Sequence, residues 1–346
     1  MTSIYLLAVS ASFFLNFIFI IPFIDFLYKL KFQRAAQKTK DIFNRPTPIF
    51  DKYNEHKKGT PVGGGIIVLA TTTLVFFLFI FLYWFFRQKI LTNYPSIASE
   101  IKIILFAFIS FGLLGLLDDL NKIFLWKKNG FFGLRFRHKA ILEAILSVII
   151  SYWLFQDLKI SFIHVPFFGV FNLGYFYILF SSLIIMAFAN AVNISDGLDG
   201  LAGGIISFAL IGFWVVSRSI LDVPTSLFIA AWLGGLLAFL YFNIYPARII
   251  MGDTGALSFG ATFAVIGLIL GKAFALPIMG GVFVIEAGSS LIQLIGKKFL
   301  KRKIFPVAPF HLYLQNKGWE EPKIVMRLWL ISIIFVIFGL MIAFMK

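Results

Sequence analysis

Cysteine is absent from this 346-residue sequence, and charged residues are scarce. Without cysteine, the chain can form neither disulfides nor thiolate metal sites. Charged residues make up only 14% of the chain, and the mean hydropathy is +0.92. A soluble domain contains about 45–50% apolar residues, whereas 60% of this chain is hydrophobic. The composition excludes an ordinary soluble protein and predicts a polytopic membrane protein.

The sequence has few acidic residues, 16 against 31 lysines and arginines, which gives a formal net charge of +15. In a soluble protein such a charge would suggest nucleic-acid binding. Here the basic residues lie in loops between apolar segments, where they orient the chain and contact anionic lipid headgroups. We therefore expect a lipid bilayer as a partner and no nucleic acid.

Long apolar runs without period-two alternation predict membrane-spanning helices rather than a β-barrel. We expect an all-α protein with about ten such helices in a single transmembrane domain that covers residues 1–346. The first apolar run, at 4–30, has no cleavage site of small residues behind it, so we expect it to be retained. The predicted helix centres lie near Phe17, Val75, Ala107, Val148, Ile184, Ile206, Leu233, Val265, Phe283 and Phe335.

Lysine and arginine are unevenly distributed between the two sides of these predicted helices. Most lie in the first loop (31–58), the third loop (122–139) and the ninth loop (297–323), and few lie in the even-numbered loops. The positive-inside rule then places the odd-numbered loops in the cytoplasm and both termini outside. The aspartates at cytoplasmic helix ends or loops, which predict an active site on that face, are Asp118, Asp119, Asp196, Asp199 and Asp253.

Two adjacent carboxylates, Asp118 and Asp119, follow the third predicted helix. Next to an apolar helix, such a pair costs solvation free energy unless a cation compensates it. Mg²⁺ or a nearby lysine could do so, and Lys122 lies one turn beyond Asp118, which also allows a simple i,i+4 ion pair. A solvated pair of helix-end carboxylates is the alternative interpretation.

The densest group of polar residues is the segment NAVNISDGLDGLAGG at 190–204. Its asparagines and aspartates recur every three residues, so on a continuing helix they project to one side. Glycines here would let the backbone approach a ligand closely. An ordinary Asx and glycine turn is the alternative, but such a turn needs far fewer of these residues, so the segment predicts a binding site.

Two further segments are candidates for phosphate binding. Asp253 opens the eighth predicted helix, where free backbone N–H groups can bind phosphate, although aspartate is also a common N-cap. The basic, glycine-rich segment at 57–65 contains Thr60 and could hold phosphate or form a flexible turn. Neither segment decides between these alternatives by itself.

Two single polar residues complete the set of candidates. His311 lies in the ninth loop, and a lone histidine is most often a packed or hydrogen-bonded side chain. Glu286 lies within an apolar run, where a carboxylate should face protein or water. It could line a substrate groove or form a buried structural hydrogen bond.

Together these segments resemble the polyprenyl-phosphate N-acetylhexosamine-1-phosphate transferase superfamily. The resemblance extends from about Lys57 to the C-terminal helix, and the closing segment 308–332 is similar to the branch that uses a muramoyl donor. It rests on the segments 59–61, 115–119, 190–204, 242–260 and 280–293.

The resemblance implies a bacterial inner-membrane enzyme of peptidoglycan synthesis. Such an enzyme transfers phospho-MurNAc-pentapeptide from UDP-MurNAc-pentapeptide to undecaprenyl phosphate, giving lipid I and UMP, with Mg²⁺ as cofactor. Two alternatives stay open, a sister enzyme that transfers GlcNAc-1-phosphate and a non-catalytic lipid carrier or transporter. The sequence also leaves open whether the chain forms a homodimer.

The roles of family residues carry over by motif position. The implied catalytic residues are Asp118, Asp119, Asp253 and His311, and Asp253 is also the implied Mg²⁺ ligand. The candidate substrate-binding residues are Lys122, Asn190, Asn193, Asp196, Asp199 and Thr60. Direct attack by the lipid phosphate, deprotonated by Asp118, is the favoured route, and prior attack by an aspartate is the other.

The chain departs from the family pattern in three places. Leu312 and Tyr313 replace the second and third of three consecutive histidines. Ile250 replaces the aromatic residue that commonly precedes the Mg²⁺ carboxylate and is associated with the uracil, and Val62-Gly63 replaces Thr-Met. None of these departures removes a carboxylate of the predicted site.

Overall fold

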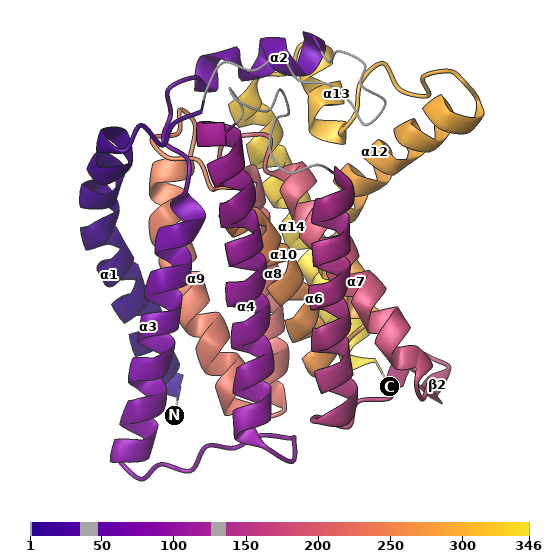
Figure 1. Ribbon diagram of the computed structural model, residues 1–346. Coiled ribbons are helices and arrows are strands. Elements are labelled where there is room, and N and C mark those ends of the chain that lie inside the picture. The colour runs from indigo at the N-terminus through magenta and orange to yellow at the C-terminus, as the bar shows by residue number, and fades with distance from the viewer. Residues whose placement is uncertain (1, 35–47, 126–135, 346) are drawn as a thin grey trace.

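The structure is a computed structural model that describes residues 2–34, 48–125 and 136–345, mostly as helices (Figure 1). The long helices are α1 (Thr2–Lys29), α3 (Gly64–Phe85), α4 (Ile97–Leu120), α6 (Phe136–Gln156), α7 (Phe176–Ser195), α8 (Leu201–Ser219), α9 (Val223–Asn243), α10 (Gly252–Ile269), α12 (Gly281–Phe299) and α14 (Glu321–Phe344). The basic loop residues that lie outside the described residues are Lys38, Lys40, Arg45, Lys127, Lys128 and Arg135.

Short elements connect the long helices. They are α2 (Pro48–Asn54), the 3₁₀ turn η1 (Glu55–Lys57), the π-helical turn η2 (Asn121–Leu125), α11 (Ala275–Met279) and α13 (Phe310–Asn316). A two-stranded antiparallel hairpin of β1 (Phe162–Val165) and β2 (Gly169–Asn172) pairs Phe162 with Asn172. Because the hairpin is so small, the molecule is in essence all-helical.

The prediction of an all-α polytopic membrane protein is confirmed. Among the described residues, nine helices are long and apolar enough to cross a membrane: α1, α3, α4, α6, α7, α8, α9, α10 and α14. The tenth predicted span, centred near Phe283, corresponds to α12, a 19-residue helix that follows a break at Gly280. This helix contains Glu286 and, in its last turn, Lys297 and Lys298, and it is not among the nine.

The two ends of the bundle are formed by different parts of the chain (Figure 1). Both termini lie at the lower end of the view, whereas α2 and α13 lie at the opposite end, which we call the upper end. The first and ninth predicted loops, from which α2 and α13 come, therefore share one end of the bundle. The functional residues described below approach one another at this upper end.

The centre of the bundle is formed by α9 and α10. In each of these helices 94% of the apolar stretch is buried inside the protein. The corresponding share is only 28% in α1 and in Arg137–Gln156 of α6. The two central helices are thus surrounded by protein, and the outer helices present aliphatic and aromatic side chains outward, as lipid contact requires. The site end of α10 is consequently held on several sides by neighbouring helices.

Glycines allow two neighbouring helices to approach the start of α10. A Cβ atom added to Gly65 of α3 would lie 2.2 Å from the backbone N of Gly255, and one added to Gly115 of α4 would lie 2.1 Å from the carbonyl O of Asp253. Backbone atoms cannot move away cheaply, so these contacts require glycine. They determine where Asp253 lies relative to α4.

We expect Gly115→Ala to destabilise the protein by about 1–3 kcal/mol, the usual cost of overpacking, because its methyl group must displace the first turn of α10. The measurement is the thermal unfolding midpoint of the purified protein in detergent. Gly288→Ala is the matched control, since a Cβ at this position of α12 meets no atom within 4 Å. Equal midpoints for the two variants would show that the close approach is unimportant.

Candidate active site

The first turn of α10 is capped by a carboxylate from another helix. Asp119, at the end of α4, accepts hydrogen bonds from the backbone N–H groups of Asp253 and Thr254, both at 3.0 Å, and from the Thr254 hydroxyl at 2.8 Å. Only 2% of Asp119 is exposed. A negative charge is favourable at a helix N-terminus, so Asp119 fixes α10 against α4 and places Asp253 beside Asp118.

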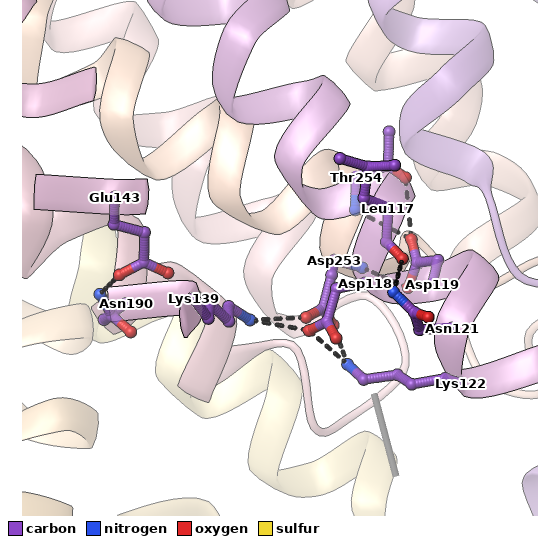
Figure 2. A network of polar contacts seen from close by, with 10 residues as sticks. All are labelled: Leu117, Asp118, Asp119, Asn121, Lys122, Lys139, Glu143, Asn190, Asp253 and Thr254. Carbon is purple, nitrogen blue, oxygen red and sulfur yellow. Dashed lines mark hydrogen bonds and ion pairs between the residues drawn. The ribbon is translucent and has the colours of Figure 1, made fainter. Parts of the chain in front are cut away.

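Two lysines bridge Asp118 and Asp253 (Figure 2). The ammonium group of Lys122 lies 2.7 Å from Asp253 and 3.3 Å from Asp118. The ammonium group of Lys139, on α6, lies 2.7 Å from Asp253 and 3.1 Å from Asp118. We call these four residues the lysine–aspartate ring. Its two positive and two negative charges compensate one another in a place largely shielded from water, as buried charges require.

The predicted residues Asp118, Asp119, Lys122 and Asp253 thus lie together, and the ring adds Lys139, which the sequence analysis treated only as a basic loop residue. No group of three His, Cys, Asp or Glu side chains within the described ranges is arranged to hold a metal ion. Asp118 and Asp253 nevertheless present carboxylate oxygens to the same two cations. Mg²⁺ is commonly held by one or two carboxylates together with substrate phosphates, so this pair fits that ion.

Asn190 connects to the ring indirectly. Its side-chain amide donates to the Glu143 carboxylate at 2.6 Å and to the Met186 carbonyl at 2.9 Å. Glu143 lies one helical turn beyond Lys139 on α6, and Figure 2 shows Glu143 beside Asn190, with Lys139 between this pair and the aspartates. Sequence reasoning missed Glu143, although a carboxylate inside an apolar run is the same signal that singled out Glu286.

A second buried ion network is centred on Lys57. Its ammonium group lies 2.8 Å from Asp199 and 2.9 Å from Glu321, and it donates to the Gly197 carbonyl at 2.9 Å. Glu321 also accepts a hydrogen bond from the Asp199 backbone N–H at 2.6 Å. Asp199 is therefore held by Lys57 and Glu321, two residues whose roles the sequence did not reveal.

Asp196 feels the charge of one member of each network, Lys57 and Asp253. Its side chain is half-buried, and burial raises the pKa of its carboxyl group to about 8, a rise that the charge of Lys57 opposes and the charge of Asp253 increases. Burial also lowers the pKa of the nearby Arg34 guanidinium, against the opposing effect of Asp196, Asp199 and Asp253. Arg34, which the sequence analysis did not single out, thus feels the charge of members of both networks.

His311 is held by Glu286. The Glu286 carboxylate accepts the His311 backbone N–H at 3.1 Å and lies 2.9 Å from its ring Nδ1, and the two side chains are at most 1% exposed. A Cβ at Gly197 would lie 2.4 Å from Nε2, so the imidazole packs against the segment that contains Asp196. Of the two interpretations of Glu286, the structure supports the buried structural hydrogen bond.

The remaining predicted residues make fewer side-chain contacts. The backbone carbonyl of Thr60 accepts a hydrogen bond from the backbone N–H of Arg34 at 3.0 Å. Asn193 is half-buried at the end of α7 and forms no side-chain hydrogen bond to the described residues. Ile250 is 8% exposed, and its carbonyl accepts the N–H groups of Gly63 and Gly64, so its side chain is part of the packing.

The fold and site define a polytopic helical membrane protein with a buried lysine and aspartate centre at one end of the bundle. Residues 101–271 match the family described as Glycosyl transferase family 4. The chain is 36% identical to the phospho-N-acetylmuramoyl-pentapeptide-transferases of Rickettsia canadensis (strain McKiel) and Rickettsia akari (strain Hartford), over 90% of this chain and 86% of each relative. It is 37% identical to the Rickettsia prowazekii (strain Madrid E) protein of that name over the same shares. The chain belongs to the phospho-N-acetylmuramoyl-pentapeptide-transferase family.

Glu286→Leu is expected to destabilise the protein strongly, because it removes the acceptor for two buried donors of His311 and each unpaired donor costs about 1–3 kcal/mol. A fall of at least about 3 °C in the thermal unfolding midpoint should result. Glu55→Gln, a change at an exposed carboxylate of the same end, serves as the control. If both variants unfold like the wild type, Glu286 does not hold α13 in place.

Proposed function

We propose that this chain transfers phospho-MurNAc-pentapeptide from UDP-MurNAc-pentapeptide to undecaprenyl phosphate, giving lipid I and UMP. The observation that carries the proposal is the lysine–aspartate ring, in which Asp118 and Asp253 share two lysines. The names of the relatives, which are 36–37% identical over most of their length, support the same donor. Both substrates carry phosphate, which matches a site rich in buried cations.

We further propose that the upper end faces the cytoplasm of a bacterial inner membrane, with both termini outside. The distribution of lysine and arginine supports this orientation. So does the chemistry, because the nucleotide donor is cytosolic and the lipid phosphate lies at headgroup level. The ring lies where a helix bundle of this kind would meet the inner leaflet.

Magnesium is the proposed cofactor, with Asp253 as its protein ligand. When bound there, it would neutralise charge on the donor diphosphate and stabilise the departing UMP. Lys122 and Lys139, released from the aspartates, would then pair with phosphate oxygens of the substrates. Two lysines that exchange one set of anions for another can bind phosphate without leaving buried charges unpaired.

In the proposed reaction Asp118 accepts the proton of the polyprenyl phosphate. The freed phosphate oxygen attacks the β-phosphorus of the donor, a new phosphorus–oxygen bond forms, and the bond from the β-phosphorus to the bridging oxygen breaks to release UMP. Asp196 and Asn190 hold the nucleotide, and His311 positions the diphosphate from its place against Gly197. Positioning and electrostatic stabilisation are the main contributions that a phosphoryl-transfer site makes.

Asp118→Asn and Asp253→Ala should each abolish turnover, because one removes the proton acceptor and the other the metal ligand. Turnover is measured as UMP release by the purified protein with undecaprenyl phosphate and UDP-MurNAc-pentapeptide. Asp157→Asn is the control, since Asp157 pairs with Lys102 far from the ring. Activity within about tenfold of wild type, which is under ~1.4 kcal/mol of barrier, would remove the altered residue from the mechanism.

Removal of divalent metal by EDTA should stop UMP release, and added Mg²⁺ should restore it. The same assay with a panel of UDP-sugars separates the muramoyl donor from the GlcNAc donor of a sister enzyme. Movement of lipid without release of UMP would instead indicate a carrier or transporter. A transferase whose turnover is indifferent to metal would contradict the proposed role of Asp253.

A further inference from the structure

The β1–β2 hairpin, which connects α6 to α7 at the lower end of the bundle, is rich in exposed aromatic residues. From Ser161 to Phe176 the chain has no lysine, arginine, aspartate or glutamate. The side chains of Phe167, Phe168, Tyr175 and Phe176 are each between 75% and 81% exposed. Such a concentration of exposed apolar side chains marks an interaction surface.

The tip of the hairpin places an aromatic residue in a conformation that normally requires glycine. The Val165 carbonyl accepts a hydrogen bond from the Phe168 backbone N–H at 3.1 Å, which closes a four-residue turn. Phe167, the third residue of this turn, has a φ of 70°, and L side chains adopt this left-handed conformation only at a cost. Because the Phe167 ring is largely exposed, packing inside the protein does not offset that cost. Burial of the ring against apolar groups outside the protein would do so.

The position of the hairpin identifies those outside groups. It connects the candidate spans Arg137–Gln156 and Phe176–Ser195, and Figure 1 shows it beside the lower end of α7, to the side of the bundle. Phe176, Leu179 and Leu183 recur every three or four residues and therefore share one face of α7, and both leucines are 58% exposed. The exposed surface of the hairpin thus continues into the lipid-facing surface of a span, at the level where aromatic residues collect in membrane proteins.

We propose that the hairpin is an interfacial anchor, whose tip at Phe167 and Phe168 inserts between the lipids of the leaflet at the lower end. The two strands pair only with each other among the described residues, so each keeps an open edge, and open sheet edges do not occur in the hydrocarbon core. The partner is therefore the boundary between headgroups and acyl chains. His164 and Asn172, which lie on the same face of the hairpin, stay within reach of water at that depth.

A second copy of this chain is the competing occupant. Each strand has only four residues, which offers a short edge for pairing with another sheet. The exposed rings also lie in two groups, Phe167 and Phe168 at the tip and Tyr175 and Phe176 at the base. Lipid surrounds the bundle and can contact both groups at once, whereas a partner protein would need one continuous patch. The arrangement therefore favours lipid.

The test uses the absence of cysteine, because Phe168→Cys then carries the only thiol of the full-length chain. A nitroxide is attached to this thiol, and the protein is placed in vesicles of phosphatidylethanolamine and phosphatidylglycerol. The collision rates of the nitroxide with oxygen, which concentrates in lipid, and with a water-soluble nickel complex are measured. The oxygen-to-nickel ratio should be close to that of Leu183→Cys on α7. It should be severalfold higher than that of Lys89→Cys, an exposed position in the connection between α3 and α4 at the same end.

Tyr175→Cys is a second reporter outside the turn and should give the same lipid-like ratio. Phe168 and Tyr175 are largely exposed, so their replacement leaves the packing of the bundle intact. A ratio at Phe168 equal to that at Lys89 places the tip in water and overturns the inference. Low collision rates with both reagents, together with a defined distance between the labels of two copies, identify a second copy as the occupant and also overturn it. None of these measurements requires turnover, so they decide the inference independently of the proposed function.

Discussion

The cap that Asp119 provides for α10 is the interaction on which the site depends. Three hydrogen bonds from the first turn of α10 end on this one buried carboxylate, and Gly115 lets the same two helices touch through their backbones. Asp253 and Asp118 belong to helices that are distant in sequence, and this contact between α4 and α10 brings them together. Lys122 follows α4 and Lys139 belongs to α6, and both lysines join the two aspartates.

Charge compensation is the second constraint. Carboxylates at the end of an apolar bundle are costly unless cations neutralise them, and here each carboxylate of the ring contacts both Lys122 and Lys139. The same need explains the burial of Lys57 between Asp199 and Glu321.

The two networks also hold the later part of the chain against the earlier part. Lys57 joins the segment before α3 to the turn after α7 and to the start of α14, and Glu286 of α12 holds His311 of α13 against Gly197. Each link contacts the segment 196–199, so this short turn joins the segment before α3 to α13 and the start of α14.

Much of the architecture was predictable from the sequence, because the length and apolarity of a membrane span are local properties. The helices, the grouping of the aspartates at one end and the importance of the segment at 190–204 all follow from local composition. The partners of each side chain do not: Lys139 reaches Asp253 across 114 positions, and Lys57 reaches Glu321 across 264. Only the tertiary structure could decide that Glu286 holds His311 and that Glu143 holds Asn190, because a hydrogen bond depends on distances between atoms that the order of residues does not specify.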